Sequence, residues 1–381
     1  MKIVTIIGAR PQIIKAAAIS RAIKAKYENE IQEIIIHTGQ HYDNNMSEVF
    51  FNELGIPHPD YNLHVGSGTH GVQTARITEG IEEILLKELP DFIMLYGDTN
   101  STLAGAVAAT KIHIPIAHVE AGMRSFNKYM PEEINRIVCD HCSTLLFSPT
   151  QSGIDNLMRE GFPLDNEPPF TINNPRVYHC GDIMYDNSLH FAKIAETKTH
   201  ILNDLGLTDK QYILATIHRD TNTDSPERLK AIFSALLKLS EEHTVVLPLH
   251  PRTDKFLKTN LKKTELEQIR CSANLIITSP IPFLEMTNLE RHASLVITDS
   301  GGVQKEAYFF KKPSIILRAE TEWVEIVKTG NAILADADEN RILEAWEHFK
   351  EHPVTDFPEI FGDGHAAEFI IEQILHSTET V

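Results

Sequence analysis

Residues Ser300-Gly301-Gly302 are of the types that commonly bind phosphate groups. They follow an apolar run, 295–298, that is typical of a buried parallel strand, and they precede a helix expected to begin at Gln304. Backbone N–H groups at a helix N-terminus attract anions, and glycine has no Cβ to hold a phosphate away from the main chain. Glu306 lies one helical turn further on, where a carboxylate could accept the two hydroxyls of a ribose. The alternative is an ordinary strand-to-helix turn.

Two basic residues follow the first apolar run of the chain. Arg10 is expected in the turn after residues 3–7, and Lys15 is expected on the first turns of the next helix. Positive charge at a helix N-terminus opposes the helix dipole unless an anion lies there. The pattern therefore favours an anion site, with two solvated charges as the alternative.

Three carboxylates occupy comparable places after successive apolar runs. Asp98 follows the run 92–96, Glu120 follows the run 114–119, and Glu132 lies at the start of a helix that begins at Pro131. Asp98 could cap a helix, and Glu132 could complement a helix dipole. A carboxylate that ends a buried strand is costly unless it is paired or functional. The repetition favours a shared acid–base role.

Histidine appears at two further strand ends. His218 precedes a polar loop and could bind phosphate or assist proton transfer. His250 lies between two prolines and is expected to be structural.

The elements that would position these residues alternate as in parallel βαβ folds. Expected strands are 3–7, 31–37, 92–96, 114–119, 144–147 and 177–180, then 212–216, 244–249, 275–278, 295–298 and 314–317. Expected helices include 12–26, 73–87, 226–239, 283–291 and 366–376. We predict an α/β protein of two Rossmann-like domains with a cleft between them. The first covers residues 1–180 and the second residues 181–365, and a final helix within 366–381 is expected to pack back on the first domain.

Composition limits the partners. The net charge of -18 disfavours nucleic acid, and no apolar run approaches the length of a membrane span. The N-terminus lacks a signal-peptide pattern, so we expect a cytoplasmic protein with reduced thiols. Cys139 and Cys142, with His118 and Glu120 upstream, resemble a zinc-deaminase pattern, but Val138 stands where that pattern has proline. Two structural cysteines are the preferred interpretation.

The motifs together resemble the non-hydrolysing UDP-N-acetylglucosamine 2-epimerase family, in order over nearly the whole chain. The matching stretches are residues 8–11 with Lys15, 38–41, 97–99, 118–124, 131–136, 148–150, 218–219, 250–251, 299–306 and 362–366.

The resemblance implies a GT-B fold and a specific reaction. UDP would be eliminated across C1–C2 to give a 2-acetamidoglucal and would return with opposite stereochemistry at C2. The implied catalytic residues are Asp98, Glu120, Glu132 and His218. The implied substrate-binding residues are Arg10, Lys15, Arg136, Ser300, Gly301, Gly302 and Glu306. The resemblance implies UDP and a UDP-sugar as ligands, a homodimer, and no metal or other cofactor.

Several departures from the usual family pattern concern the sugar. Trp323 stands where an arginine is usual, Ile281 and Met286 replace a glutamine and a phenylalanine near the uracil, and the spacer 125–130 is short. These features resemble the branch that acts on UDP-2,3-diacetamido-2,3-dideoxyglucuronate. The alternative functions are those of a GT-B glycosyltransferase, a hydrolysing epimerase and an inactive sugar-nucleotide sensor.

Overall fold

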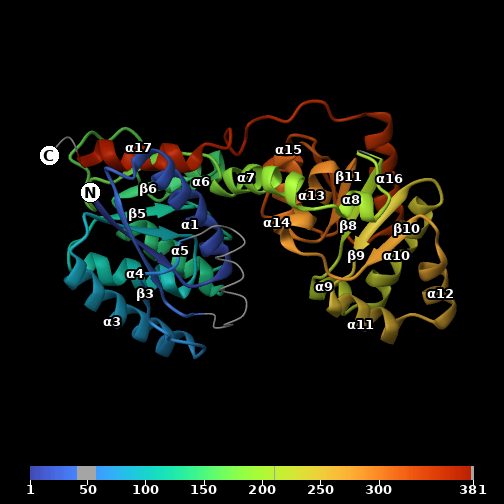
Figure 1. Cartoon of the computed structure of the whole chain (residues 1–381), viewed down its shortest axis with the longest axis horizontal. Helices are drawn as coiled ribbons and strands as arrows, with labels where there is room; N and C mark the ends of the chain where they lie inside the picture. Colours follow the sequence, from blue (N-terminus) through green and yellow to red (C-terminus); the bar gives the residue numbers. More distant parts are fainter. Residues whose placement is uncertain (41–56, 210, 379–381) are drawn as a thin grey trace. The chain divides into compact units, whose positions relative to one another are not determined.

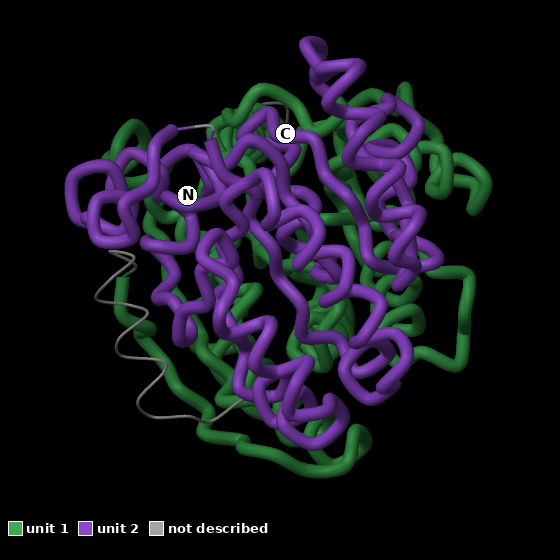
Figure 2. Tube along the Cα trace, turned by 90° about the vertical axis from the view of Figure 1, so that its right-hand side faces the viewer, with its two compact units in different colours: residues 1–187, 360–381 green, residues 188–359 purple. Residues whose placement is uncertain are grey.

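The computed structural model describes residues 1–40, 57–209 and 211–378 and divides the chain into two compact units. Unit 1 comprises Met1–Asn187 and Ile360–Val381, and unit 2 comprises Ser188–Glu359 (Figure 2). The first unit therefore extends beyond residue 180, where the sequence places the boundary, and the chain returns to it at Ile360 rather than at residue 366. His41, part of one family motif, lies outside the described residues.

Unit 1 is built on a parallel sheet of seven strands in the order β3-β2-β1-β4-β5-β6-β7. The strands are β1 Lys2–Ile7, β2 Gln32–His37, β3 Tyr61–Asn62, β4 Phe92–Tyr96, β5 Ile116–Val119, β6 Leu145–Ser148 and β7 Arg176–His179. Strands β1, β4, β5 and β6 are almost entirely buried, which explains their continuous apolar sequence.

The helices of unit 1 connect these strands (Figure 1). They are α1 Arg10–Ala22, which continues into a π-helical turn Ile23–Tyr27, then α3 His70–Glu88, α4 Asn100–Lys111, α5 Pro131–Cys142, α6 Gln151–Arg159 and α17 Ala366–Thr378; α7 Ile183–Lys198 leads into unit 2. The last helix is held in unit 1 by polar contacts, because Lys26 pairs with Glu368 at 2.5 Å and Tyr27 donates to Glu372 at 3.0 Å.

Unit 2 has a parallel sheet of six strands in the order β10-β9-β8-β11-β12-β13. The strands are β8 Tyr212–Thr216, β9 Thr244–Pro248, β10 Leu275–Thr278, β11 Leu295–Thr298, β12 Ser314–Ile316 and β13 Ala332–Leu334. Its helices are α8 Ile201–Asp204, α9 Asp220–Thr223, α10 Pro226–Ser240, α11 Pro251–Asn260, α12 Lys263–Cys271, α13 Phe283–His292, α14 Gly301–Phe309, α15 Val324–Lys328 and α16 Glu339–Glu351. The expectation of two Rossmann-like units is confirmed.

Each sheet has one point at which the strand order reverses. It lies between β1 and β4 in unit 1 and between β8 and β11 in unit 2. Open parallel sheets bind ligands beyond the carboxyl ends of the strands at such points. The loops that follow these four strands contain Asp98, His218 and Ser300, and α1 begins at Arg10 directly after the first loop. The topology therefore points to two binding regions, one in each unit.

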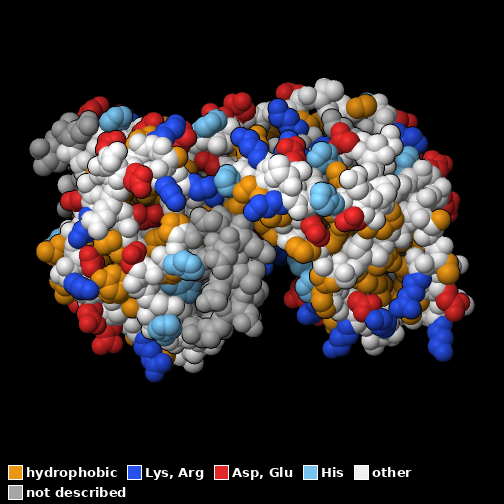
Figure 3. Space-filling model, viewed as in Figure 1, with side chains coloured by type: hydrophobic (Ala, Val, Ile, Leu, Met, Phe, Trp, Pro, Cys, Tyr) orange, Lys and Arg blue, Asp and Glu red, His pale blue; other side chains and the backbone are white. Residues whose placement is uncertain are grey.

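On the face drawn in Figure 3, acidic and basic side chains are interspersed over both units. Within the described part of the chain, no helix is long and apolar enough to cross a membrane.

Candidate active-site residues

Asp98 follows β4 and lies against α5. Its carboxylate forms an ion pair with Arg136, and its backbone carbonyl accepts a 2.8 Å hydrogen bond from Asn135. Asp98 does not cap α4, because Thr99 is the N-cap and accepts from the Ser101 N–H at 3.1 Å. The capping explanation for Asp98 is thus wrong, and its carboxylate is directed to an arginine instead.

Glu120 follows β5 and forms an ion pair with Lys15 of α1. The two side chains are only 22% and 12% exposed. Glu120 has a φ of +74°, a left-handed conformation that is unfavourable for a residue with a side chain and is often found at functional sites. Lys15, expected from the sequence to lie near an anion, thus pairs with a carboxylate of the protein itself.

Gly97 brings the two ion pairs close together. Its φ is +61°, and a Cβ built on it would lie 3.3 Å from Lys15 Nζ and 3.5 Å from Glu120 Oε2. The positive φ therefore favours glycine here, and a side chain would press on Lys15. Asp98–Arg136 and Glu120–Lys15 flank this glycine at the ends of two paired strands, β4 and β5.

The structure does not join Glu132 to these pairs. Glu132 is exposed, and among the described contacts none links it to Asp98 or Glu120. The neighbouring Glu133 is buried and accepts from Ser125 N at 2.8 Å, Phe126 N at 2.9 Å and Arg136 Nη1 at 3.1 Å. Burial alone would raise the pKa of Glu133, but these hydrogen bonds lower it. Glu133 therefore fixes the loop before α5 and orients Arg136.

Arg10 is the first residue of α1 and is exposed. The preceding loop is held from behind by Gln12, whose Oε1 accepts from Gly8 N at 2.9 Å and whose Nε2 donates to Tyr96 O at 3.0 Å. Gln12 thus ties the end of β1 to the end of β4.

A buried pair, His118 and Asp140, was not anticipated as part of the site. His118 Nδ1 lies 2.7 Å from Asp140 Oδ1, and Nε2 lies 2.9 Å from the Gly97 carbonyl oxygen. Burial disfavours a charged ring, but Cys139 and Asp140 beside it raise the pKa of His118 well above its ordinary value. The signal in the sequence is a histidine inside an apolar strand, since a buried polar group needs partners.

In unit 2, helix α14 begins at Gly301, three residues earlier than expected, with Ser300 as its N-cap. The Ser300 hydroxyl accepts from Val303 N at 3.4 Å. A Cβ on Gly301 would have its nearest neighbour, Glu322 Oε2, at 3.5 Å, and a Cβ on Gly302 would have Ser300 Oγ at 3.8 Å. Both glycines therefore lie in the first helical turn, where backbone N–H groups favour an anion, and the side chains of Glu322, Trp323 and Arg219 border Gly301.

Asp299 connects the loops after β8 and β11. It is fully buried and accepts from His218 N and Arg219 N, each at 3.1 Å, and from Asn222 Nδ2 at 3.1 Å. Burial opposes ionisation, but hydrogen bonds from His218 and Asn222 lower the pKa of Asp299. The His218 ring lies 3.2 Å from the same carboxylate and is 41% exposed, so Asp299 orients a ring that remains accessible.

His250 and Glu306 are two further residues of unit 2 that the sequence singled out. His250 caps α11, accepting from Arg252 N at 3.2 Å, which agrees with its structural interpretation. Glu306 lies on α14, and burial together with its charge raises the pKa of Glu290 on α13 well above the ordinary value. The ribose-binding role of Glu306 stays a prediction.

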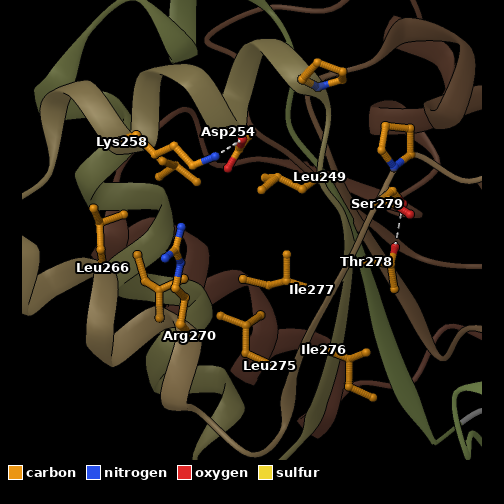
Figure 4. A pocket seen from close by; sticks show the side chains of 14 residues that line it. Leu249, Asp254, Lys258, Leu266, Arg270, Leu275, Ile276, Ile277, Thr278 and Ser279 are labelled. Carbon is orange, nitrogen blue, oxygen red and sulfur yellow. Dashed lines mark hydrogen bonds and ion pairs between the residues drawn. The ribbon is translucent and has the colours of Figure 1, made fainter.

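A cavity of about 750 Å³ in unit 2 lies apart from these residues (Figure 4). Leu249, Leu266, Leu275 and Ile277 form much of its wall, and the ion pair of Lys258 with Asp254 lies at one side. None of the predicted site residues lines it.

The protein has two doubly wound parallel sheets. Unit 2 has a helix N-terminus that contains two glycines, and unit 1 has two carboxylates that are each paired with a cation. These features are those of an α/β enzyme of the nucleotide-binding class. The chain belongs to the UDP-N-acetylglucosamine 2-epimerase family, whose family model matches residues 23–375. It is accordingly an epimerase, a kind of isomerase.

Similarity to individual proteins extends over whole chains. A UDP-N-acetylglucosamine 2-epimerase homolog of Methanococcus maripaludis is 48% identical over 98% of this chain and 99% of its own. The UDP-2,3-diacetamido-2,3-dideoxy-D-glucuronate 2-epimerase of Pseudomonas aeruginosa is 46% identical, again over 98% and 99%. The solved structure of UDP-GlcNAc 2-epimerase from Methanocaldococcus jannaschii has a TM-score of 0.86 at 39% identity, covering 99% of this chain and 100% of that one. The same enzyme in complex with UDP-GlcNAc and UDP has a TM-score of 0.77 at 40% identity, with the same coverage.

Proposed function

We propose that the protein inverts C2 of a UDP-N-acetylhexosamine, interconverting UDP-N-acetylglucosamine and UDP-N-acetylmannosamine. The observation that carries this proposal is the pair of carboxylate–cation contacts, Asp98–Arg136 and Glu120–Lys15, on either side of Gly97. Inversion at C2 needs a proton removed from one face of the sugar and returned to the other. Two separately held carboxylates suit that task.

The proposed reaction begins with removal of the C2 proton by a carboxylate. The electrons of the C2–H bond form a C1–C2 double bond, while the C1–oxygen bond breaks and its electrons leave with UDP. The resulting 2-acetamidoglucal regains UDP at C1 and a proton at C2 from the opposite face. Asp98 and Glu120 are assigned to these transfers, with Glu132 and His218 as further acid–base candidates.

UDP must be stabilised as it leaves, because the C2 proton is only weakly acidic. We assign the diphosphate to Ser300, Gly301 and Gly302, where first-turn N–H groups and the helix dipole favour negative charge. Arg10 and His218 are assigned to phosphate contacts and Glu306 to the ribose. Except for Arg10, the residues assigned to the nucleotide lie in unit 2, whereas Asp98 and Glu120 lie in unit 1, so both units contribute residues to the proposed reaction.

A second substrate, UDP-2,3-diacetamido-2,3-dideoxyglucuronate, is favoured by Trp323. Its indole nitrogen lies 3.7 Å from a Cβ built on Gly301, and Lys305 Nζ lies 4.3 Å from its ring centroid. The residue that departs from the usual pattern is thus beside the proposed diphosphate site. The 46% identity to the Pseudomonas aeruginosa enzyme supports the same alternative.

Proton NMR of the enzyme in D2O with each sugar nucleotide in turn tests the proposal. We expect a C2 epimer carrying deuterium at C2, formed without any acceptor. Stoichiometric free UDP with a free sugar would instead identify a hydrolysing epimerase. A requirement for an acceptor would identify a glycosyltransferase, and the sugar nucleotide that is converted faster identifies the substrate.

A further inference from the structure

His118 lies in the middle of a hydrogen-bonded chain beneath the two carboxylate–cation pairs. One ring nitrogen faces the Asp140 carboxylate at 2.7 Å, and the other faces the Gly97 carbonyl oxygen at 2.9 Å. All three groups are removed from solvent, and His118 and Asp140 are fully buried. The ring is therefore removed from bulk solvent.

The identity of the two partners determines how many protons the ring carries. A carbonyl oxygen only accepts hydrogen bonds, so Nε2 must carry a proton. Asp140 also accepts from Gly122 N at 3.1 Å and pairs with the buried Arg124 guanidinium at 2.7 Å, which favours an ionised carboxylate. Nδ1 must then carry a proton as well. The ring is an imidazolium.

The surrounding charges balance this cation. Arg124 contacts both Asp140 and Glu160, each at 2.7 Å, so positive and negative groups alternate from His118 to Glu160. Cys139 of α5, which is also fully buried, lies beside the ring. Each charge in this chain is paired with a neighbour of opposite sign. Such pairing offsets the cost of burying the charges.

We propose that His118 is a positioning residue for the epimerisation: an imidazolium that, together with Asp140, fixes the backbone beside both acid–base carboxylates. The Gly97 carbonyl that it binds belongs to the peptide unit joining Gly97 to Asp98. Asp140 binds the N–H of Gly122, two residues after Glu120. One buried pair thus holds the strand ends that present Asp98 and Glu120 to the sugar.

The catalytic part of this inference rests on the proposed function. Amide substitutions at His118 separate its two hydrogen bonds, one to Asp140 and one to Gly97. In His118→Asn the amide nitrogen takes the place of Nδ1 and keeps the bond to Asp140 only. In His118→Gln it takes the place of Nε2 and keeps the bond to Gly97. A displacement of about 1 Å at a reacting group can lower the rate by roughly 100-fold.

We therefore expect His118→Asn to lower kcat roughly 10- to 100-fold with an unchanged Kd for UDP, and His118→Gln to recover most of the lost turnover. His141→Asn, which changes an exposed histidine of α5 next to Asp140, should behave as wild type. Equal kcat values in wild type and His118→Asn, or equal losses in the two amide variants, would overturn the positioning role.

Nitrogen-15 NMR of the wild-type ring provides a readout independent of activity. Both His118 nitrogens should carry a directly bonded proton at pH 8. A single protonated nitrogen combined with normal C2 exchange would overturn this inference alone. A wild-type protein without C2 exchange would overturn the proposed function, and the positioning role with it, whatever the state of the ring.

Discussion

Lys15 and Glu120 are 105 residues apart in the sequence, yet their side chains form an ion pair beside Gly97. The contact joins the first helix of unit 1 to the end of β5. It places a cation against a carboxylate in a partly buried position, and a Cβ on residue 97 would lie 3.3 Å from Lys15 Nζ. Two predictions follow from this arrangement.

Glu120→Gln should lose turnover by roughly 10²–10⁴-fold, the usual effect of removing a general acid or base. The affinity for UDP should be retained, because Glu120 is not among the residues assigned to the nucleotide, most of which lie in unit 2. Steady-state kinetics and calorimetry with UDP measure the two quantities. Glu79→Gln, an exposed substitution on α3, is the matched control. Near-normal turnover with normal C2 exchange in Glu120→Gln would make Glu120 a structural residue.

Gly97→Ala should reduce kcat, because a Cβ 3.3 Å from Lys15 Nζ presses on the ion pair, but by less than the roughly 100-fold loss that a 1 Å displacement causes. The left-handed backbone adds a stability cost of about 1–2 kcal/mol. Gly330→Ala carries a similar strain, with a φ of +77° and nothing within 4 Å, and therefore serves as the control. Similar activities in both variants, measured at equal folded fraction, would show that space beside Gly97 is unimportant.

The diphosphate assignment predicts that Gly301→Leu weakens UDP binding by roughly 10- to 100-fold, equivalent to losing one charge-assisted hydrogen bond. Folding should be little affected, because the nearest atom to the new Cβ is 3.5 Å away. Gly71→Leu, in the first turn of α3 with nothing within 4 Å, is the control. Unchanged UDP affinity by calorimetry would move the phosphate site elsewhere.

Sequence patterns predicted the elements and strand-end residues because both leave local signals. Fully buried parallel strands are continuous apolar runs, and polar residues directly after them lie at one edge of the sheet. Asp98, Glu120 and Ser300 were identified in this way. The three-residue strand β13 and the two-residue strand β3 were missed because such short runs have no detectable periodicity.

The contacts among these residues were less predictable because they depend on tertiary structure. Glu132 and Glu133 are adjacent residues of the same type, and only the packing of the loop before α5 buries Glu133. The start of α14 at Gly301 depends on Ser300 acting as the cap. The links from His118 to Asp140 and Gly97 span 22 and 21 residues, which no local pattern encodes.

The charged state of His118 makes its contribution to stability depend on pH. Its pKa is raised above the ordinary 6.5, so the contribution is complete below about pH 6.5 and is lost as pH rises through the raised pKa. The pKa of Asp140 is lowered below the ordinary 3.8, so its contribution is lost only in acid.

We therefore expect the free energy of unfolding of wild type to exceed that of His118→Asn by an amount that is largest between about pH 4 and 6.5 and shrinks above it. Urea denaturation at a series of pH values measures this difference. A difference that stays constant or grows with pH would show that the ring is neutral in the folded protein.

The central claim is that carboxylates of unit 1 exchange the C2 proton of a UDP-linked 2-acetamido sugar. The most direct test is NMR of the wild-type enzyme with UDP-N-acetylglucosamine, and separately with its 2,3-diacetamido uronate relative, in D2O. We predict deuterium at C2 in both epimers of at least one of these sugar nucleotides, and loss of that exchange in Glu120→Gln. Formation of the epimer without deuterium at C2, or no conversion of either sugar nucleotide, would contradict the account.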